Sequence, residues 1–379
     1  MRARNQGLSL VELMVAVTLA LITTVVVMQV LSVYEARKRT ATVGNDAEMS
    51  AAVGLFMLER EIRSAGAGLT LPSGLACANG INGHYNGTTF SDGAAFAPLR
   101  IVDGGVVGGV PRPDRVRVMH SDAAFGVAPA TILQGMGAAS SPVTVSTAVG
   151  LVESDLMLLG ASDGQKLCTL MQLSEDPVPV GTTLQLVHGS AASYPYNPAS
   201  PSASFATAMR YDVGDIVVNL GQLGLRTFGV ICDPAGAPSA TNSCDLAAWN
   251  TLAAPANPTL AQADSISSQV VNLQVQYGVA PAGSQAVDQW VNATGGTWAN
   301  PSAADMARIK VVRIVIVTRG NFERDPEDPT NLVSPTPLVL WDDGPAAQRN
   351  IPLTDDERRF RYKVLRVVVP LINVIWADV

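Results

Sequence analysis

One serine has the neighbours that covalent catalysis requires. Gly160-Ala-Ser-Asp-Gly164 fits the G-x-S-x-G pattern, in which a serine hydroxyl attacks an acyl carbon. That chemistry needs a sharp turn from a strand into a helix, whereas the residues after Gly164 are typical of a second strand. We therefore expect Ser162 to lie in a β-turn between two strands and not in a catalytic centre.

The three histidines are the next candidates, for acid–base catalysis or for zinc binding. His84, His120 and His188 show neither the E-x-x-H nor the H-x-x-x-H spacing that brings two ligands to one helix face. His120 and His188 fall at the ends of expected strands, where a solvated side chain is normal. The sequence therefore predicts neither a catalytic triad nor a zinc site.

Carboxylates gather in short segments that could bind calcium. The acidic segments are Glu323-Arg-Asp-Pro-Glu-Asp328, Asp342-Asp343 and Asp355-Asp-Glu357. None has the D-x-D-x-D-G register of a calcium loop, so we expect solvated loops.

The tryptophans in the second half of the chain are candidate ligand platforms. We expect packing residues rather than a glycan platform at Trp290, Trp298, Trp341 and Trp376. No catalytic residue, metal or cofactor is predicted.

The four cysteines are Cys77, Cys168, Cys232 and Cys244, and they form no C-x-x-C pair. Disulfides are favoured, with buried free thiols as the alternative. Three pairings are possible. A turn-rich segment separates Cys232 from Cys244 and favours joining those two, which leaves Cys77 for Cys168. Disulfides require an oxidising compartment outside the cytosol.

The elements that position these residues begin with an apolar N-terminal run. Leu13–Val33 holds 21 residues without a charge. As a helix at ~1.5 Å per residue it spans about 32 Å, close to the hydrocarbon thickness of a bilayer. A transmembrane helix is predicted over 13–33. Arg2 and Arg4 precede it, so the positive-inside rule places the remainder of the chain across the membrane.

The helix is expected to continue beyond the membrane. Pro is absent before Pro72, so Leu8 to about Ser64 can form one helix of roughly 85 Å at ~1.5 Å per residue. Past Tyr34 the sequence is amphipathic, and this half is expected to pack on a globular head. Its apolar stripes are Met49, Val53 and Phe56, and Leu55, Leu58 and Ile62. Solvated positions are expected for Glu35, Arg37, Lys38, Arg39, Glu59, Glu61 and Arg63.

One carboxylate, Glu12, lies inside the apolar run. An ionised carboxylate near hydrocarbon is costly unless it is paired, so it is a functional candidate by default. The alternative is a side chain that extends to the membrane interface without a function.

The segment Gly7-Leu-Ser-Leu-Val-Glu-Leu-Met14 resembles the class III signal of type IV prepilins. The resemblance implies that prepilin peptidase cuts between Gly7 and Leu8 and methylates the new amine, with Glu12 as the acid at mature position five. Leu8 departs from the phenylalanine usual at the first mature position. Loss of the leader changes the formal charge from -7 to -9, since Arg2 and Arg4 leave with it.

The charges suggest how such a subunit assembles. The ammonium group of Leu8 lies in apolar surroundings, and Glu12 of an incoming subunit can neutralise the ammonium of a neighbour already in the filament. Two isolated membrane charges then become one pair that sets the register of the packed helices.

The remainder of the chain is expected to be a β-rich head. Alternating or β-branched segments predict strands at 114–120, 183–187, 270–277 and 309–317, and loops at 189–204 and 253–258. The fold class is α+β and type IV pilin-like: a leader (1–7), an N-terminal helix (8–66) and a head (67–379). The net charge of -7 argues against nucleic-acid binding, which needs a basic face.

Three blocks of the head resemble PilW-type minor pilins. They are Asp155–Gly164 with the strand at Cys168, Leu273–Val279 with Val287–Trp290, and Arg361–Asn373 as a closing strand, where Ile372 replaces a common arginine. The resemblance implies a non-enzymatic subunit of a tip or priming complex that supports twitching motility, adhesion or DNA uptake. Its partners would be the major pilin, other minor pilins, prepilin peptidase, the inner-membrane assembly platform and, before assembly, membrane lipid.

Two alternatives remain open at the level of the sequence. A minor pseudopilin of a type II secretion system would share the leader and Glu12. A signal-anchored periplasmic enzyme or binding protein would need neither Gly7 nor Glu12.

Overall fold

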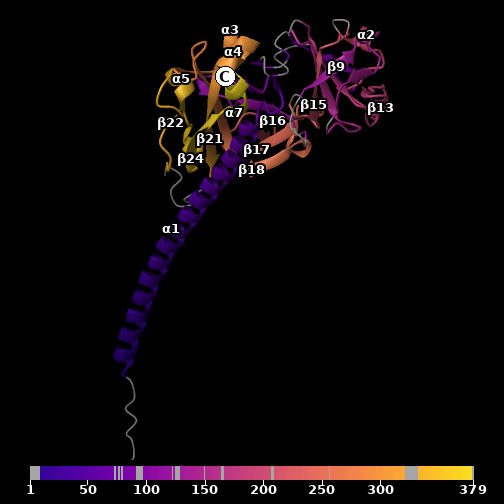
Figure 1. Cartoon of the computed structure of the whole chain (residues 1–379). Helices are drawn as coiled ribbons and strands as arrows, with labels where there is room; N and C mark the ends of the chain where they lie inside the picture. Colours follow the sequence, from indigo (N-terminus) through magenta and orange to yellow (C-terminus); the bar gives the residue numbers. More distant parts are fainter. Residues whose placement is uncertain are drawn as a thin grey trace, which may run out of the picture.

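The computed structural model of the chain describes residues 9–71, 74–75, 77, 80–90, 97–121, 123, 129–148, 150–163, 166–205, 209–255, 257–320 and 332–377. A long helix, α1 (Leu10–Ser64), projects from a large β-rich head (Figure 1). The head has a proximal lobe that contacts α1 and a distal lobe that carries β9, β13 and β15 and lies farther from the helix. The expected combination of an apolar N-terminal helix and a large β-rich head is confirmed.

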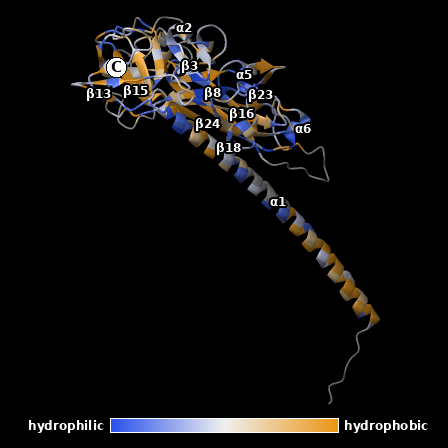
Figure 2. Cartoon of the chain, turned by 90° about the vertical axis from the view of Figure 1, so that its right-hand side faces the viewer, coloured by the Kyte–Doolittle hydropathy of each residue, from blue (hydrophilic) through white to orange (hydrophobic). Residues whose placement is uncertain are grey.

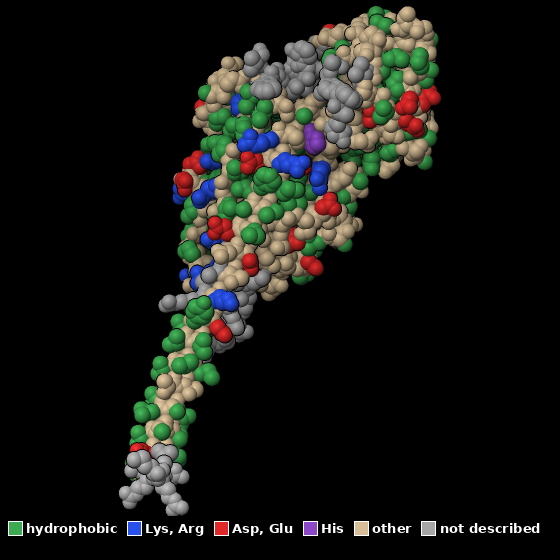
Figure 3. Space-filling model, turned by 60° about the horizontal axis from the view of Figure 1, so that its bottom comes forward, with side chains coloured by type: hydrophobic (Ala, Val, Ile, Leu, Met, Phe, Trp, Pro, Cys, Tyr) green, Lys and Arg blue, Asp and Glu red, His purple; other side chains and the backbone are tan. Residues whose placement is uncertain are grey.

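The first half of α1 is apolar and uncovered. Leu10–Glu35 is long and apolar enough to cross a membrane, and its residues are exposed throughout. Most residues of this part of the helix are hydrophobic (Figure 2), and their side chains lie at its surface (Figure 3). Its hydroxyls are satisfied within the helix, since Thr18 donates to the Val15 oxygen at 2.9 Å and Thr24 to the Ala20 oxygen at 2.7 Å. Unpaired hydroxyls would be costly in hydrocarbon.

The second half of α1 packs on the proximal lobe through small residues. Its buried residues are Ala47, Ala51, Gly54, Leu58 and Ile62, and Leu55 is half-buried. A Cβ atom on Gly54 would lie 3.1 Å from Leu246 and 3.2 Å from Ser267. At Gly54 the backbone of the helix therefore lies directly against the strands, and a larger side chain would not fit there.

One of the two apolar stripes expected to contact the head was predicted wrongly. Leu58 and Ile62 are buried, whereas Met49, Val53 and Phe56 are 71%, 47% and 64% exposed. Hydrophobic spacing detects an apolar stripe but does not show which face another element covers. Close approach of the strands favours the face with the smallest side chains.

Two antiparallel sheets build the proximal lobe. The four-stranded sheet has the order β20 (Gln289–Val291), β19 (Val270–Val279), β21 (Ile309–Arg319) and β24 (Tyr362–Pro370). The five-stranded sheet has the order β18 (Asp264–Ser268), β17 (Ser243–Asn250), β16 (Gly224–Asp233), β8 (Arg115–His120) and β5 (Leu99–Val102). One buried hydrophobic cluster joins both sheets to α1.

A nine-stranded sheet runs through the distal lobe. Its order is β13 (Val178–Val180), β14 (Thr183–Leu186), β10 (Val143–Val145), β9 (Ala130–Gln134), β15 (Ile216–Gly221), β11 (Leu156–Gly160), β12 (Cys168–Gln172), β3 (Ile81–Tyr85) and β4 (Thr88–Phe90). Only β12 and β3 pair in parallel among these described strands. The lobe has a hydrophobic cluster of its own that contains no residue of α1.

Short elements complete the described part of the head. Two-stranded pairs are β1 (Thr70–Leu71) with β2 (Gly74–Leu75), β6 (Val106–Val107) with β7 (Val110–Pro111), and β22 (Leu338–Val339) with β23 (Asn350–Ile351). The helices are α2 (Pro201–Ser204), η2 (Leu260–Gln262), α3 (Gly296–Ala299), α4 (Ala303–Arg308), α5 (Ala346–Arg349), α6 (Asp355–Arg358) and α7 (Ile372–Ala377).

The distal lobe is largely an insertion into a β-hairpin of the proximal lobe. Strands β8 and β16 pair in antiparallel register, with His120 opposite Gly224. Residues 121–223 therefore leave the proximal lobe at the end of one strand and return at the start of its neighbour. Without them, the two strands would need only a tight turn.

The four segments predicted as strands are confirmed as β8, β14, β19 and β21. Two details were predicted wrongly. The closing strand ends at Pro370, and α7 begins at Ile372, because the chain turns at Leu371: its N–H still donates to the Lys310 oxygen at 2.9 Å, while its own oxygen accepts from the N–H groups of Val374 and Ile375 in the helix. The loop expected over 189–204 contains α2, which starts at Pro201, a residue suited to the first turn of a helix.

Candidate functional site

Ser162 lies between two antiparallel strands, as expected. Strands β11 and β12 pair with Leu159 opposite Thr169, and the backbone N–H of Ser162 donates to Asp215 Oδ1 at 3.1 Å. Gly164 lies outside the described residues. Because a strand and not a helix follows, the geometry of a nucleophile elbow is missing.

The histidines lie apart and do not form a site. His84 Nε2 accepts from the Gly87 N–H at 3.2 Å, and burial lowers the pKa of this ring. The expected solvation of His188 is wrong: its side chain is buried, and Nε2 donates to the Ser141 oxygen at 3.0 Å. Burial lowers its pKa as well. Among the described residues, no group of three His, Cys, Asp or Glu side chains is placed to hold a metal.

The described acidic segments form ion pairs and helix caps. Asp343 Oδ1 lies 2.8 Å from an Arg313 nitrogen, and Asp355 lies 3.3 Å from Arg358. Glu357 accepts from both the N–H and the hydroxyl of Thr354 at 2.8 Å, which caps α6. The segment 323–328 lies outside the described residues.

The cysteines form two disulfides, in the pairing that the sequence favoured. Cys232 and Cys244 lie opposite each other on β16 and β17. Cys77 and Cys168 join the segment after β2 to strand β12 of the distal lobe. No free cysteine remains.

Two of the predicted packing tryptophans enclose an arginine. The Arg313 guanidinium carbon lies 4.8 Å from the ring centre of Trp290 and 4.4 Å from that of Trp341. Trp298 contacts Arg308 in the same way at 5.5 Å. The side chain of Trp376 lies outside the described ones. These contacts are cation–π interactions that pack the three rings against arginine side chains, as expected for packing residues.

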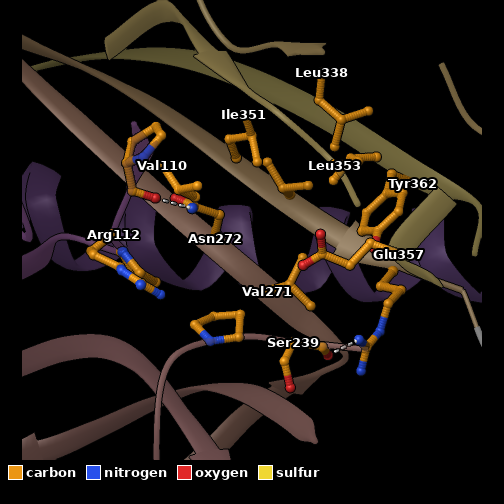
Figure 4. A pocket seen from close by; sticks show the side chains of 15 residues that line it. Val110, Arg112, Ser239, Val271, Asn272, Leu338, Ile351, Leu353, Glu357 and Tyr362 are labelled. Atoms are coloured by element: carbon orange, nitrogen blue, oxygen red, sulfur yellow. Dashed lines mark hydrogen bonds between the residues drawn. The ribbon is translucent and has the colours of Figure 1, made fainter. Parts of the chain in front are cut away.

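A small pocket lies between the four-stranded sheet and the β22–β23 pair (Figure 4). Apolar side chains such as Val271 and Leu338 line it together with Glu357 and Tyr362. Its volume of about 50 Å³ has room for a few water molecules and for no organic substrate. Catalytic geometry is therefore not apparent in this pocket.

The N-terminal end of α1 carries the candidate assembly residues. Ser9 is the N-cap, and its N–H donates to Glu12 Oε2 at 3.3 Å. Glu12 is exposed, as are the apolar residues around it. Gly7 and Leu8 lie outside the described residues, so their predicted roles stay predictions.

The middle of α1 is held by groups that sequence reasoning missed. The Ser267 hydroxyl donates to the Ser50 oxygen at 2.5 Å, and the Thr318 hydroxyl donates to the Ala47 oxygen at 2.9 Å. Both hydroxyls come from strands and reach carbonyl oxygens of the helix. A serine or threonine in a strand carries no signal of this role, because the partner is a backbone oxygen more than two hundred residues away.

Glu61 was expected to be solvated, and this is wrong. Its side chain is 19% exposed, with Oε2 at 3.7 Å from His120 Nε2 and Oε1 at 3.8 Å from Arg226. The neighbouring His120 lowers the pKa of Glu61, assisted by Arg226 and Arg60 and opposed by burial. These contacts link α1 to β8 and β16.

Asp114 joins the two sheets of the proximal lobe. It is fully buried and accepts from the Gly104 N–H at 2.9 Å and the Val275 N–H at 2.8 Å, while its own N–H donates to the Leu273 oxygen. Burial raises its pKa well above the usual range for a carboxyl group. The sequence placed it only as the first residue of a strand.

Comparison with protein families finds a match in the C-terminal third of the chain. Residues 244–373 match the family model PilW, described as type IV pilus-assembly protein W. The matched segment includes β18, β21, β24 and the start of α7, which contact α1; β8, which also contacts α1, lies outside the match. No curated protein and no solved structure matches the chain. The match indicates a role in type IV pilus assembly.

Proposed function

We propose that this chain is a minor pilin of the PilW type, processed by prepilin peptidase between Gly7 and Leu8 and incorporated into a type IV pilus. The match of residues 244–373 carries the proposal. The location of this segment supports it, because three of the matched strands, β18, β21 and β24, contact α1. The matched region is thus the part that joins a membrane helix to a head, a structural role rather than a catalytic one.

In the proposed mechanism the first half of α1 moves from lipid into the core of the filament. Its exposed apolar side chains, from Leu10 to Tyr34, contact lipid before assembly. After assembly they pack against the helices of other pilins. Glu12 of this chain neutralises the N-terminal ammonium of a neighbouring subunit. The pair removes two isolated charges from apolar surroundings and selects one register.

The contacts between helix and head allow the two to move as one body. Hydrogen bonds from Thr318 and Ser267 hold the middle of α1, and the contacts of Glu61 with His120 and Arg226 hold its end. A force applied to the head is therefore transmitted to the membrane half of the helix without a flexible linker. The proposed subunit joins other minor pilins in a tip or priming complex, with its head on the periplasmic side and later at the cell surface.

The test is mass spectrometry of the N-terminal peptide, from the native membrane and from sheared surface filaments. A mature chain that begins at Leu8 and is present in filaments supports the proposal, and an uncleaved Met1 contradicts it. Processed Leu8 in a cell that assembles only a secretion pseudopilus would reassign the chain to a minor pseudopilin. An intact leader on a functional protein would favour an anchored periplasmic protein.

The role of Glu12 needs a matched control within the same helix. Glu12→Gln keeps the size of the side chain and removes its charge, so it should leave cleavage intact and reduce incorporation into filaments. Glu59→Gln is the control, because Glu59 pairs with Arg63 at 2.7 Å on the surface of α1 outside the membrane span. Equal incorporation of both variants would contradict the proposed charge pair.

A further inference from the structure

Strand β24 is a long open edge of the four-stranded sheet. It pairs with β21 on one side, and no strand among the described residues pairs with its other side. The edge strands β4, β5, β13, β18 and β20 have three to five residues, whereas β24 has nine. Short edge strands limit pairing with foreign strands, and a long one is a ready template for it.

The register with β21 determines which backbone groups of β24 point outward. The Gly320 N–H donates to the Arg361 oxygen at 2.8 Å, and the Leu371 N–H donates to the Lys310 oxygen at 2.9 Å. Bonded pairs recur at every second residue of an antiparallel ladder, so the odd-numbered residues of β24 bond to β21. The residues whose N–H and oxygen face the open side are, in the middle of the strand, Val364, Arg366 and Val368.

The charged side chains of β24 do not shield this edge. Lys363 Nζ lies 3.1 Å from a Glu48 oxygen on α1. The Arg366 guanidinium donates to two backbone oxygens, one of them that of Val339, at 2.7 and 2.9 Å. Val339 and Val368 are 46% and 53% exposed. The edge therefore combines outward backbone groups with exposed apolar side chains, as sites of β-strand addition do.

The direction of β24 limits which chain can pair with it. Near its start Lys363 contacts Glu48, and just after its end Asn373 contacts Ala65 at the end of α1, at 3.0 Å. The strand therefore runs in the same direction as α1. Two copies paired antiparallel through β24 would have their α1 helices in opposite directions, which two subunits anchored in one membrane cannot adopt. A different subunit beside this one can supply a strand that runs towards the membrane.

The charge of the edge indicates the chemistry of that strand. Residues 361–370 include Arg361, Lys363 and Arg366 and no acidic residue. The two oxygens that Arg366 contacts are neutral, so they do not compensate its charge. Opposite charges on paired strands stabilise a sheet. We propose that a neighbouring pilus subunit adds an acidic strand to the open edge of β24, antiparallel to it. This inference rests on the proposed function, since it requires a second kind of subunit anchored in the same membrane.

The experiment measures amide hydrogen exchange on β24 in the full chain, purified in detergent and incorporated in sheared filaments. The amides of Val364, Arg366 and Val368 should exchange at least about tenfold more slowly in filaments, because each gains a hydrogen bond. Equal rates in both samples overturn the proposal, whereas a mature N-terminus at Leu8 in the same filaments leaves the proposed function intact. Absence of the chain from filaments overturns both.

The purified chain also reports on the other possible occupants of the edge. Slow exchange of these amides at every protein concentration would show that the chain covers its own edge. Exchange that slows as the concentration rises would identify a second copy as the occupant. Either result overturns the assignment to a neighbouring subunit.

Two variants at one position test the pairing by function. Val368→Pro removes an outward N–H and no bond to β21, and proline is tolerated on strand edges. Val368→Thr is the matched control, since it keeps the N–H and the branched shape. With both variants folded by thermal unfolding and both cleaved before Leu8, Val368→Pro should be about tenfold less abundant in filaments. Equal incorporation of the two variants overturns the proposal.

Discussion

The side-chain amide nitrogen of Asn373 lies 3.0 Å from the backbone oxygen of Ala65, at the residue that ends α1. The same amide also faces the oxygens of Arg63 and Ser64, at 3.4 and 3.5 Å. Carbonyl groups at the C-terminus of a helix lack partners within the helix. Helix α7 therefore supplies, through Asn373, hydrogen-bond donors for the carbonyl oxygens at the C-terminal end of α1.

Replacing this amide should destabilise the protein. Asn373→Ala is expected to lower the free energy of unfolding by about 1 kcal/mol, the usual loss for a hydrogen bond of this kind. Asn373→Asp should cost more, because a carboxylate would face the negative end of the helix dipole. Chemical denaturation of the three proteins measures both effects. An aspartate variant as stable as the wild type would contradict the capping role.

Gly54 should not tolerate a large side chain. Gly54→Leu is expected to cost about 1–3 kcal/mol through overpacking, since Leu246 and Ser267 lie where the side chain would begin. Val53→Leu is the control, since residue 53 is on the exposed face and the change should lie within about 0.5 kcal/mol. Thermal unfolding distinguishes the two. Equal midpoints would show that the helix does not lie against the strands.

The contact between Glu61 and His120 should give a pH-dependent contribution to stability. The pKa of Glu61 is lowered in the folded state, so its contribution is full above the unfolded value of about 4.3. It is lost as the pH falls through the lower folded pKa. Glu61→Gln should therefore destabilise the protein near neutral pH, and the difference from wild type should shrink in acid. Unfolding free energies measured at several pH values check this sign, and a difference that grows in acid would contradict it.

The inserted segment should be removable. Replacing residues 121–223 by Asn-Gly joins His120 to Gly224 through a turn suited to a two-residue hairpin, and Cys77→Ser removes the cysteine that would lose its partner. The proximal lobe and α1 should still fold, because their hydrophobic cluster contains no residue of the segment. Stability should decrease, since Met119 and Leu225 lose buried neighbours such as Leu220. Amide exchange on β19 and β21 measures the result, and rapid exchange there would show that the segment is required.

The sequence was most informative where one local pattern determined the structure. The long helix follows from an apolar run without proline, and β21 follows from the β-branched segment after Ile309. The Cys232–Cys244 pair follows from a short turn-rich connection. In each case the interacting residues are close in the chain.

Contacts between distant segments were not predictable in this way. The burial of Ala47 and the exposure of Phe56 depend on strands hundreds of residues later, and the ion pair of Glu61 depends on β8 and β16. The insertion into the β8–β16 hairpin was also missed, because strand order cannot be read from periodicity. The helix face that is buried, the contacts of Glu61 and the insertion all depend on which strands lie side by side, and periodicity does not give that.

The insertion also has a mechanical consequence. If a ligand held by the distal lobe is pulled away while α1 is anchored, tension enters the proximal lobe at His120 and Gly224, which are neighbouring ends of one hairpin. Both strand ends are pulled in the same direction, so the load passes into β8 and β16 together. The Cys77–Cys168 disulfide provides a second, covalent route from β12 to the chain just after α1. It can therefore carry load that would otherwise pass through β8 and β16 alone.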